Sequence, residues 1–403
     1  MNISTYSPME YLMIDLATTF GNDKGTFDEA IEWVKENSKN LDKLVHEADE
    51  PALYMKSLMA LRNAAKTGYT NHRIELDACA SGLQMFAALT GCVQTASQVG
   101  MVDPDKRCDV YTALMGYMNK YLPEEKHIGY SPEGLQRQDL KTPFMTHYYQ
   151  STKQPEQVFG KGTAQLVAFY KACSQMCPGG EDALASLAGC VQEGITEYAT
   201  TMPDGHYTNT KVITQVSKKI TIDEIPTASG KPSSMSHVYD VVQWDDGFRA
   251  LGSKGAHITD AYGVREMRRR AKHNKDELLL VDSALQGCKL TDPTEPVSIA
   301  LAQRVLEGED ITDNQGALLA KIIDGVLDKP SFELVTIHDA FTALPQYGNE
   351  VRWYYREILA EIAESNLFQR MLRDFSRTNG TYTKMEGHEE LPSLIRQSNY
   401  CLR

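Results

Sequence analysis

FELVTIHDAF, residues 332–341, contains an apolar run rich in β-branched residues, then an adjacent His338-Asp339 pair, then the start of a second apolar segment. This pattern predicts a strand–turn–strand hairpin that lifts one carboxylate out of a buried sheet. A His-Asp pair is also common in an ordinary solvated turn. The functional interpretation therefore needs a second carboxylate, presented in the same way elsewhere in the chain.

The overall composition is that of a globular protein. The 403 residues are 42% hydrophobic and 24% charged, which is enough chain for two or three domains with cores of their own. There is no run of about 18 or more apolar residues and no signal-peptide pattern at the start, so no membrane association is expected. Eight scattered cysteines without zinc-ligand spacing predict reduced thiols.

The formal charge of −13 argues mildly against a nucleic-acid partner, because phosphate binding needs lysine and arginine. Basic residues nevertheless cluster in two places, at 265–272 (REMRRRAK) and around 211–219. A protein with a negative total can still present a basic face. The net charge therefore does not exclude nucleic acid.

A matching carboxylate occurs in residues 71–90, NHRIELDACASGLQMFAALT. Ile74 and Leu76 predict a short strand that ends at Asp77, and small residues then lead into an apolar helix starting near Gly82. A backbone with such small side chains suits the close approach of a bulky ligand. The structural alternative is a capped helix start, with Asp77 or Ser81 as the capping residue.

A basic and aromatic stripe lies between the two carboxylates, in residues 134–151. Its members, four residues apart and hence on one face of a helix, are Arg137, Lys141, Met145 and Tyr149. Two cations followed by an aromatic ring suit a polyphosphate followed by a base. A solvated basic turn before a core aromatic is the alternative, and Pro143 favours a kink in the helix.

The remaining pattern is mostly helical. Residues 8–65 are predicted to form helices, with Thr26 and Glu29 as a capping box after the polar loop 21–25. Strands are expected across 203–245, further helices at 97–122, 156–200, 262–272 and 349–373, and at least two helices in 271–330.

Two carboxylates at strand ends, with cations between them in sequence, form a recognisable chemical set. Carboxylates are the hard oxygen ligands that Mg²⁺ requires, and two of them can hold two ions about 3.5–4 Å apart for in-line phosphoryl transfer. One ion would activate an attacking hydroxyl and the other would stabilise the leaving pyrophosphate. Asp77, the stripe and Asp339 together therefore indicate a nucleotidyl transferase.

These motifs resemble the single-subunit RNA polymerases of phages and mitochondria. Residues 77–84 (DACASGLQ) are similar to the first palm motif of that family, the stripe to its fingers-helix motif, and residues 337–339 to its second palm motif. Weaker similarities are found at Lys24, at Tyr111, at 202–205 and at 255–268. The resemblance covers most of residues 8–365, and its specificity lies in the three short motifs.

The resemblance implies a role for each matching residue. Asp77 and Asp339 would bind two Mg²⁺ ions, with the backbone carbonyl of Ala78 as a further ligand. Arg137 and Lys141 would bind the triphosphate, with Lys24 as a further contact, and Tyr111 would lie near the incoming nucleotide. Tyr149 would lie by the base and sugar and take part in selecting ribose, and Lys141 and Tyr149 would count among the catalytic residues. His338 would position the primer end or Asp339, or simply cap the turn.

Some positions depart from the family pattern. Gln150 replaces the glycine that usually follows the tyrosine, and Gly263 stands where many members carry a histidine. The segment from about 271 to 330 is longer than the short connection that the family has at this place, which implies an insertion. Nothing in residues 1–70 resembles the thumb or the N-terminal domain, so both are expected to be absent from this chain.

That absence implies partners. The pattern resembles the larger, C-terminal subunit of a heterodimeric middle-gene RNA polymerase of lytic coliphages, acting in the cytoplasm of the infected host. A smaller subunit would then supply the thumb and N-terminal elements. DNA template, RNA product and nucleoside triphosphates are the other expected partners, with a single-stranded-DNA-binding protein as a possible recruiter.

Two rival functions remain open at this point. A related DNA polymerase usually has a glutamate five residues after the first aspartate, where this chain has Gly82, and this favours ribonucleotides. A non-catalytic nucleic-acid-binding subunit with the same fold is the second rival, and the joint presence of Asp77, Lys141, Tyr149 and Asp339 speaks against it.

The expected fold is α+β and mainly helical, a right-hand palm and fingers with a small antiparallel palm sheet. Four regions are predicted. They are a helical palm-associated segment (1–70), the first palm motif (71–92), the fingers (93–255), and a palm return with the inserted region and second aspartate motif (256–403).

Overall fold

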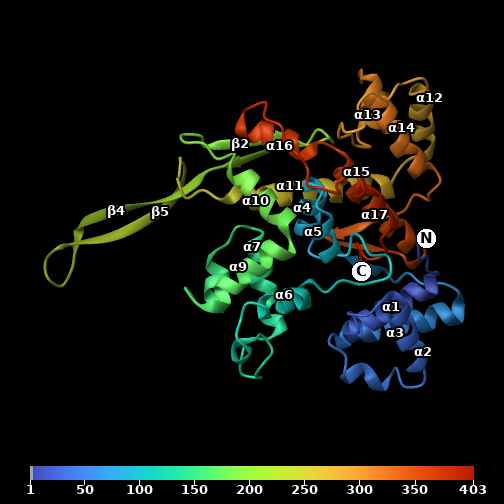
Figure 1. The fold of residues 1–403 in the computed structure, drawn as a ribbon, viewed down its shortest axis with the longest axis horizontal. Helices are drawn as coiled ribbons and strands as arrows, with labels where there is room; N and C mark the ends of the chain where they lie inside the picture. Colours follow the sequence, from blue (N-terminus) through green and yellow to red (C-terminus); the bar gives the residue numbers. More distant parts are fainter. Residues whose placement is uncertain (1–2) are drawn as a thin grey trace.

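The computed structural model describes residues 3–403, and the chain is drawn in Figure 1. Its α-helices are α1 (Pro8–Phe20), α2 (Phe27–Glu36), α3 (Pro51–Thr67), α4 (Ser81–Thr90), α5 (Val93–Gln98), α6 (Val110–Asn119), α7 (Lys141–His147), α8 (Lys153–Phe159), α9 (Ala164–Met176), α10 (Pro178–Ala188), α11 (Ala250–Ala271), α12 (Lys275–Ala284), α13 (Leu301–Leu306), α14 (Asp313–Leu327), α15 (Gly348–Glu364), α16 (Leu367–Ser376) and α17 (Leu391–Gln397). The strands are β1 (Ile74–Asp77), β2 (Glu197–Thr201), β3 (Tyr207–Lys211), β4 (Ile213–Pro226), β5 (Pro232–Val242), β6 (Val335–Ile337) and β7 (Ala340–Ala343). Short 3₁₀ helices are η1 (Lys43–His46), η2 (Glu124–Lys126), η3 (Arg137–Leu140) and η4 (Pro345–Tyr347).

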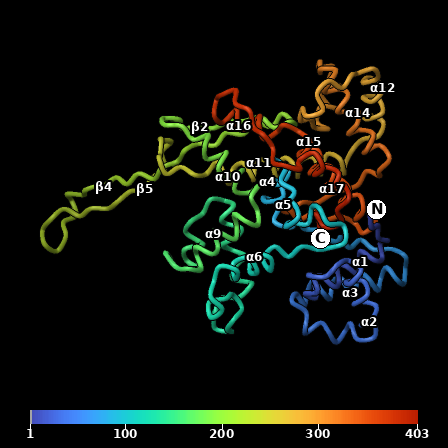
Figure 2. Tube along the Cα trace, viewed as in Figure 1, coloured from blue at the N-terminus to red at the C-terminus, as the bar shows by residue number. Residues whose placement is uncertain are grey.

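The N-terminal helices α1–α3 form one lobe, drawn in blue in Figure 2. The predicted capping box at the start of α2 is confirmed: Thr26 Oγ1 accepts from the Glu29 amide at 3.2 Å, and Glu29 accepts from the Thr26 amide at 2.6 Å. Each bond satisfies an amide that a helix start leaves without a partner. The loop 21–25 is therefore held between two well-defined helices.

A three-stranded antiparallel sheet with strand order β1-β7-β6 joins segments far apart in the sequence. Ile337 pairs with Ala340 across a two-residue turn, so the predicted hairpin is confirmed. Ala340 also pairs with Asp77, which is the last residue of β1. Residues 402 and 403 lie along the other edge of β1, through hydrogen bonds between the backbones of Asp77 and Arg403 of 2.7 and 2.9 Å.

Helices α4, α11 and α15 pack together behind this sheet, near the centre of Figure 1. All ten residues of α4 are buried. Gln84, the large polar residue among them, donates to the carbonyls of Val99 and Cys401 at 2.9 and 3.0 Å and accepts from Tyr355 at 2.8 Å. Its amide is fully paired, so it can be buried without the usual penalty for a polar group.

The predicted single helix over the basic stripe is wrong. Arg137 belongs to η3, Lys141 and Met145 lie in α7, and Tyr149 follows the end of α7. Pro143 sits in the first turn of α7, where its missing amide hydrogen breaks no helical bond. The expected helix over 349–373 is likewise divided into α15 and α16, at Ser365.

Two parts project from the central helices in Figure 1. Strands β4 and β5 pair along their length as a solvent-exposed hairpin arm, which confirms the strands expected in 203–245. Helices α12–α14 form a separate group within the region from 271 to 330, where at least two helices were expected.

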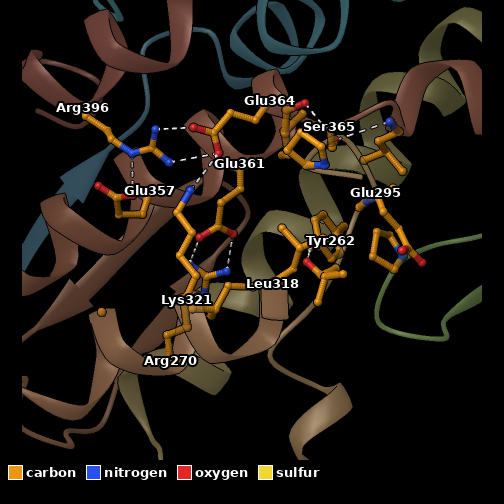
Figure 3. Close-up of a pocket in the computed structure, with 18 of the residues that line it drawn as sticks. Tyr262, Arg270, Glu295, Leu318, Lys321, Glu357, Glu361, Glu364, Ser365 and Arg396 are labelled. Atoms are coloured by element: carbon orange, nitrogen blue, oxygen red, sulfur yellow. Dashed lines mark hydrogen bonds and ion pairs between the residues drawn. The ribbon is translucent and has the colours of Figure 1, made fainter. Parts of the chain in front are cut away.

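A buried ionic network attaches this helical group to α11. The guanidinium of Arg270 bonds both carboxylate oxygens of Glu361 at 2.8 and 2.5 Å and reaches Glu266 at 3.1 Å. Glu266 in turn accepts from the Ser298 hydroxyl at 2.5 Å. Figure 3 shows Arg270 and Glu361 beside a cavity between α11, α14 and α15.

Four of the charged groups on the wall of that cavity are paired with one another. Arg396 bonds Glu357 and Glu364, and Lys321 lies 3.6 Å from Glu364. Because these charges satisfy each other, we interpret the cavity wall as a structural junction between the helical group and the core.

The expected fold class is confirmed in its general form: the chain is about half helical, with small antiparallel sheets. Among residues 3–403, no helix is long and apolar enough to cross a membrane.

Candidate functional site

The two predicted carboxylates lie at the same end of the three-stranded sheet. Asp77 ends β1, and Asp339 occupies the turn between β6 and β7. The amide of Ala78 donates to the carbonyl of Asp339 at 3.3 Å, so the two segments are joined directly by their backbones. Asp339 is half-buried, whereas Asp77 and His338 are exposed.

The backbone around this pair adopts unusual conformations. His338 has φ 55° and Ala80, just before α4, has φ 56°. Residues other than glycine rarely adopt this left-handed backbone conformation, and those that do cluster at functional sites. Gln150, with φ 60°, lies at the end of α7 beside the same site, so three of the four such residues in the described chain gather here.

The negative charges at the site disturb one another. Although Asp77 as a residue is exposed, partial desolvation of its carboxyl group, followed by the charge of Asp339, raises the pKa of Asp77, and Arg403 opposes the shift. A third carboxylate, Asp260 of α11, has its pKa raised to about 6 by burial and by Asp339, against a hydrogen bond from Ser81. Carboxylates that repel one another in one place favour protonation or the binding of a cation.

The donor set fits magnesium. Within residues 3–403 there is no group of three or more acidic, histidine or cysteine side chains arranged as a closed metal cage. Mg²⁺ does not need one, because it keeps several waters and is usually bound by one or two carboxylates plus substrate phosphates. Asp77 and Asp339, two carboxylates at a solvent-accessible sheet end whose like charges raise the pKa of Asp77, are donors of this kind.

The two cations of the stripe have different surroundings. Lys141 is exposed and has no ion-pair partner among the described residues. Arg137 forms a bidentate pair with Asp109, with Nε and Nη2 at 2.7 and 2.6 Å from its oxygens, and lies over the ring of Tyr111. Burial would raise the pKa of Asp109, but the hydrogen bonds from Arg137 and Thr112 outweigh it and hold the pKa at about 2.

A basic group connects the loop 21–25 with the sheet. Arg107 donates to the carbonyl of Gly25 at 3.0 Å, and burial together with the charge of Arg403 lowers the pKa of Arg107 to about 10. Asp23 in the same loop interacts with the charges of Arg107 and Arg137. Lys24 is exposed beside Asp23 and has no ion-pair partner in the described chain.

Tyr149 packs against the start of α4 and against α11. A Cβ built on Gly82 would lie 3.5 Å from Tyr149 Cε1 and 3.6 Å from its hydroxyl, so the space that a larger residue would fill adjoins the ring. The ring of His257 lies 4.9 Å from the ring of Tyr149, centroid to centroid. Burial raises the pKa of Tyr149, and Asp260 and Asp339 add to the effect.

Sequence reasoning missed three members of this site. His257 and Asp260 are three residues apart on α11, and that spacing on one helix face was the available signal. The histidine that lies beside Tyr149 is His257. Gly263, the position at which many family members carry a histidine, lies next to Met85 instead. Arg403 gave no sequence signal, because only the folded chain places it along β1.

Comparison with known proteins identifies the family. The family model of DNA-dependent RNA polymerase matches residues 4–244, more than half of the chain. The DNA-directed RNA polymerase of Pseudomonas phage phiKMV is 26% identical over 170 residues, covering 35% of this chain and 21% of the relative. The mitochondrial DNA-directed RNA polymerase of Neurospora crassa is 27% identical over 234 residues, covering 47% of this chain and 16% of the relative.

The matched region thus spans about a fifth or less of the length of these relatives. The family match to residues 4–244 includes Asp77, Arg137, Lys141 and Tyr149, whereas Asp339 lies beyond it and joins the site through the sheet. By the family match and these relatives, the chain belongs to the DNA-dependent RNA polymerases of the single-subunit type.

Proposed function

We propose that this chain carries the catalytic palm and fingers of a DNA-dependent RNA polymerase and transfers ribonucleoside monophosphates to an RNA 3′-hydroxyl. The observation that carries the proposal is the meeting of Asp77 and Asp339 at one end of the sheet, although 262 positions separate them in the chain. The proposed regions are those expected from the sequence: a helical palm-associated segment (1–70), the first palm motif (71–92), the fingers (93–255) and the palm return with the second aspartate motif (256–403).

Asp77 and Asp339 are proposed to hold two Mg²⁺ ions, with the carbonyl of Ala78 as a further ligand. When bound, the ions would lower the pKa of the attacking hydroxyl and neutralise the leaving pyrophosphate. In the transfer, the RNA 3′-oxygen bonds to the α-phosphorus and the bond from that phosphorus to the pyrophosphate oxygen breaks.

The cations of the site are proposed to bind the triphosphate. Lys141 is exposed and has no ion-pair partner in residues 3–403, so its ammonium can contact a phosphate without breaking an ion pair described there. Arg137 uses Nε and Nη2 for Asp109, which leaves Nη1 for a phosphate oxygen. Lys24 and Tyr111 are proposed as further contacts to the nucleotide, and His338 would position the primer end.

Ribose selection is proposed to depend on the space beside Tyr149 that Gly82 leaves free of a side chain, where a Cβ would already contact the tyrosine ring. Replacing Gly82 by glutamate fills this space and is expected to lower ribonucleotide incorporation by about tenfold or more relative to deoxyribonucleotide incorporation. Single-nucleotide extension of an RNA primer on a DNA template, with ATP or dATP opposite thymine, measures the ratio. An unchanged ratio would refute this role for the Gly82 space.

Removal of divalent cations provides a second prediction. Chelation with EDTA is expected to abolish nucleotide transfer and leave the helical circular dichroism unchanged, because the carboxylates lie on the sheet surface and not in the core. Addition of Mg²⁺ should restore transfer. Loss of helical signal on chelation would instead indicate a structural metal.

The partners proposed are those that the resemblance of the sequence motifs implies. A smaller subunit carrying the thumb and N-terminal elements would complete the enzyme, and a single-stranded-DNA-binding protein would recruit it. The test of the whole proposal is templated extension of a primed RNA–DNA hybrid by the chain, assayed alone and with proteins copurified from its natural source. Extension that follows the template sequence supports the polymerase proposal. The absence of extension both with the chain alone and with the copurified proteins contradicts the proposal.

A further inference from the structure

The turn that carries Tyr149 is closed by a residue poorly suited to its conformation. Gln150 N donates to His147 O at 2.8 Å and Ser151 N donates to Thr146 O at 2.9 Å. These two bonds form a Schellman-type helix end, in which the left-handed position is usually glycine. Here Gln150 occupies it with φ 60°, which is unfavourable for a side chain with a Cβ. Something outside the turn must therefore stabilise it.

The side chain of Gln150 is held outside the turn by packing and by one long hydrogen bond, while its Oε1 is buried with no hydrogen-bond partner among the described residues. Its Nε2 donates to the carbonyl of Leu184 in α10 at 3.4 Å. Its amide group fills a slot left open by Gly252 of α11, because a Cβ built on Gly252 would lie only 2.5 Å from Gln150 Cδ. Gln150 thus contacts α10 and α11 at once.

The same face of α11 also contacts the surroundings of Tyr149. Ala256, one helical turn after Gly252, lies 3.6 Å from a Cβ built on Gly82, and His257 packs against the ring of Tyr149. The glycine that contacts Gln150 and the residues that surround Tyr149 therefore belong to the same helix, α11. Movement of Gln150 out of its slot would move the neighbouring Tyr149 relative to Gly82.

We infer that Gln150 is a positioning residue, whose side chain, seated against Gly252, fixes Tyr149 for nucleotide selection without touching the nucleotide. The inference rests on the proposed polymerase function for its kinetic consequence. The anchoring contact itself does not depend on that function.

The test uses the full chain, with its partners where transfer requires them. Gln150→Gly keeps the left-handed turn but removes the anchor, and Gly252→Ala blocks the slot with a methyl group. Both variants are expected to show faster hydrogen exchange at the amides of residues 149–151. They are also expected to raise KM for the ribonucleotide and to lower ribose-over-deoxyribose selection by about tenfold, with a smaller change in kcat.

A matched control and a double variant separate positioning from general damage. Gly116→Ala also adds a methyl group to a helical glycine, but its Cβ would have no neighbour within 4 Å, so wild-type exchange and kinetics are expected. In Gln150→Gly/Gly252→Ala the clash is gone, so the double variant should be no worse than Gln150→Gly alone. Additive effects, or wild-type exchange in Gln150→Gly, would overturn the inference.

The two proposals can fail separately. A wild-type protein that transfers no nucleotide refutes the polymerase proposal. The hydrogen-exchange measurements would then still test whether the contact between Gln150 and Gly252 stabilises the turn. Faster exchange with unchanged nucleotide selection in an active enzyme overturns the positioning role of Gln150 and leaves the polymerase proposal intact.

Discussion

Asp339→Asn is expected to reduce nucleotide transfer by about a thousandfold or more, because it removes a negative oxygen from the proposed metal site. The turn conformation should survive, since the backbone bond from Ala78 to the Asp339 carbonyl does not involve the side chain. Asp77→Asn should have the same effect. Primer extension at saturating Mg²⁺ and nucleotide measures kcat for each variant.

The matched control for these variants is Glu75→Gln. Glu75 lies two residues before Asp77 on the same exposed face of β1. It is outside the proposed metal site, so the loss of its charge should leave transfer within about threefold of wild type. Equal losses in Asp339→Asn and Glu75→Gln would mean that general surface charge matters, and would contradict the two-carboxylate mechanism.

Arg270→Met is expected to lower the free energy of unfolding by about 3–5 kcal/mol, because it removes the guanidinium that pairs with Glu266 and Glu361 and leaves buried Glu266 only the more distant Arg269, at 3.5 Å. The side chain of Arg270 is only 1% exposed, and that of Glu266 is fully buried. Urea denaturation followed by circular dichroism gives the change.

Arg304→Met is the matched control for this network. Arg304 pairs with Glu309, and both side chains are about half exposed, at 51% and 49%. Solvent already screens this pair, so the expected loss is at most about 1 kcal/mol. A similar loss in both variants would show that the buried network contributes no more than a surface pair.

Local sequence rules were sufficient for the elements that depend on neighbouring residues. The capping box of Thr26 and Glu29, the strand ending at Asp77 and the hairpin around His338 were predicted because each is determined by short-range hydrogen bonding and alternation of apolar residues. The helical stripe failed because spacing of four residues does not reveal where η3 gives way to α7.

Contacts between distant segments were outside the reach of those rules. Nothing in the sequence around Arg137 indicated that Asp109 would hold it, and nothing around Gln150 indicated the slot at Gly252. Asp260 was missed for the same reason: its raised pKa arises from burial and from Asp339, which belongs to another element.

By itself, the sequence determined the two carboxylate motifs, the cations between them and the mainly helical α+β class, because these follow from residue type and spacing. Only the tertiary structure decided that Asp77 and Asp339 share one end of a sheet, that Asp260 and Arg403 join them, and that Gln150 is anchored beside Tyr149. The physical reason is that backbone pairing and close packing act through space, between residues whose separation in the chain carries no record of their contact.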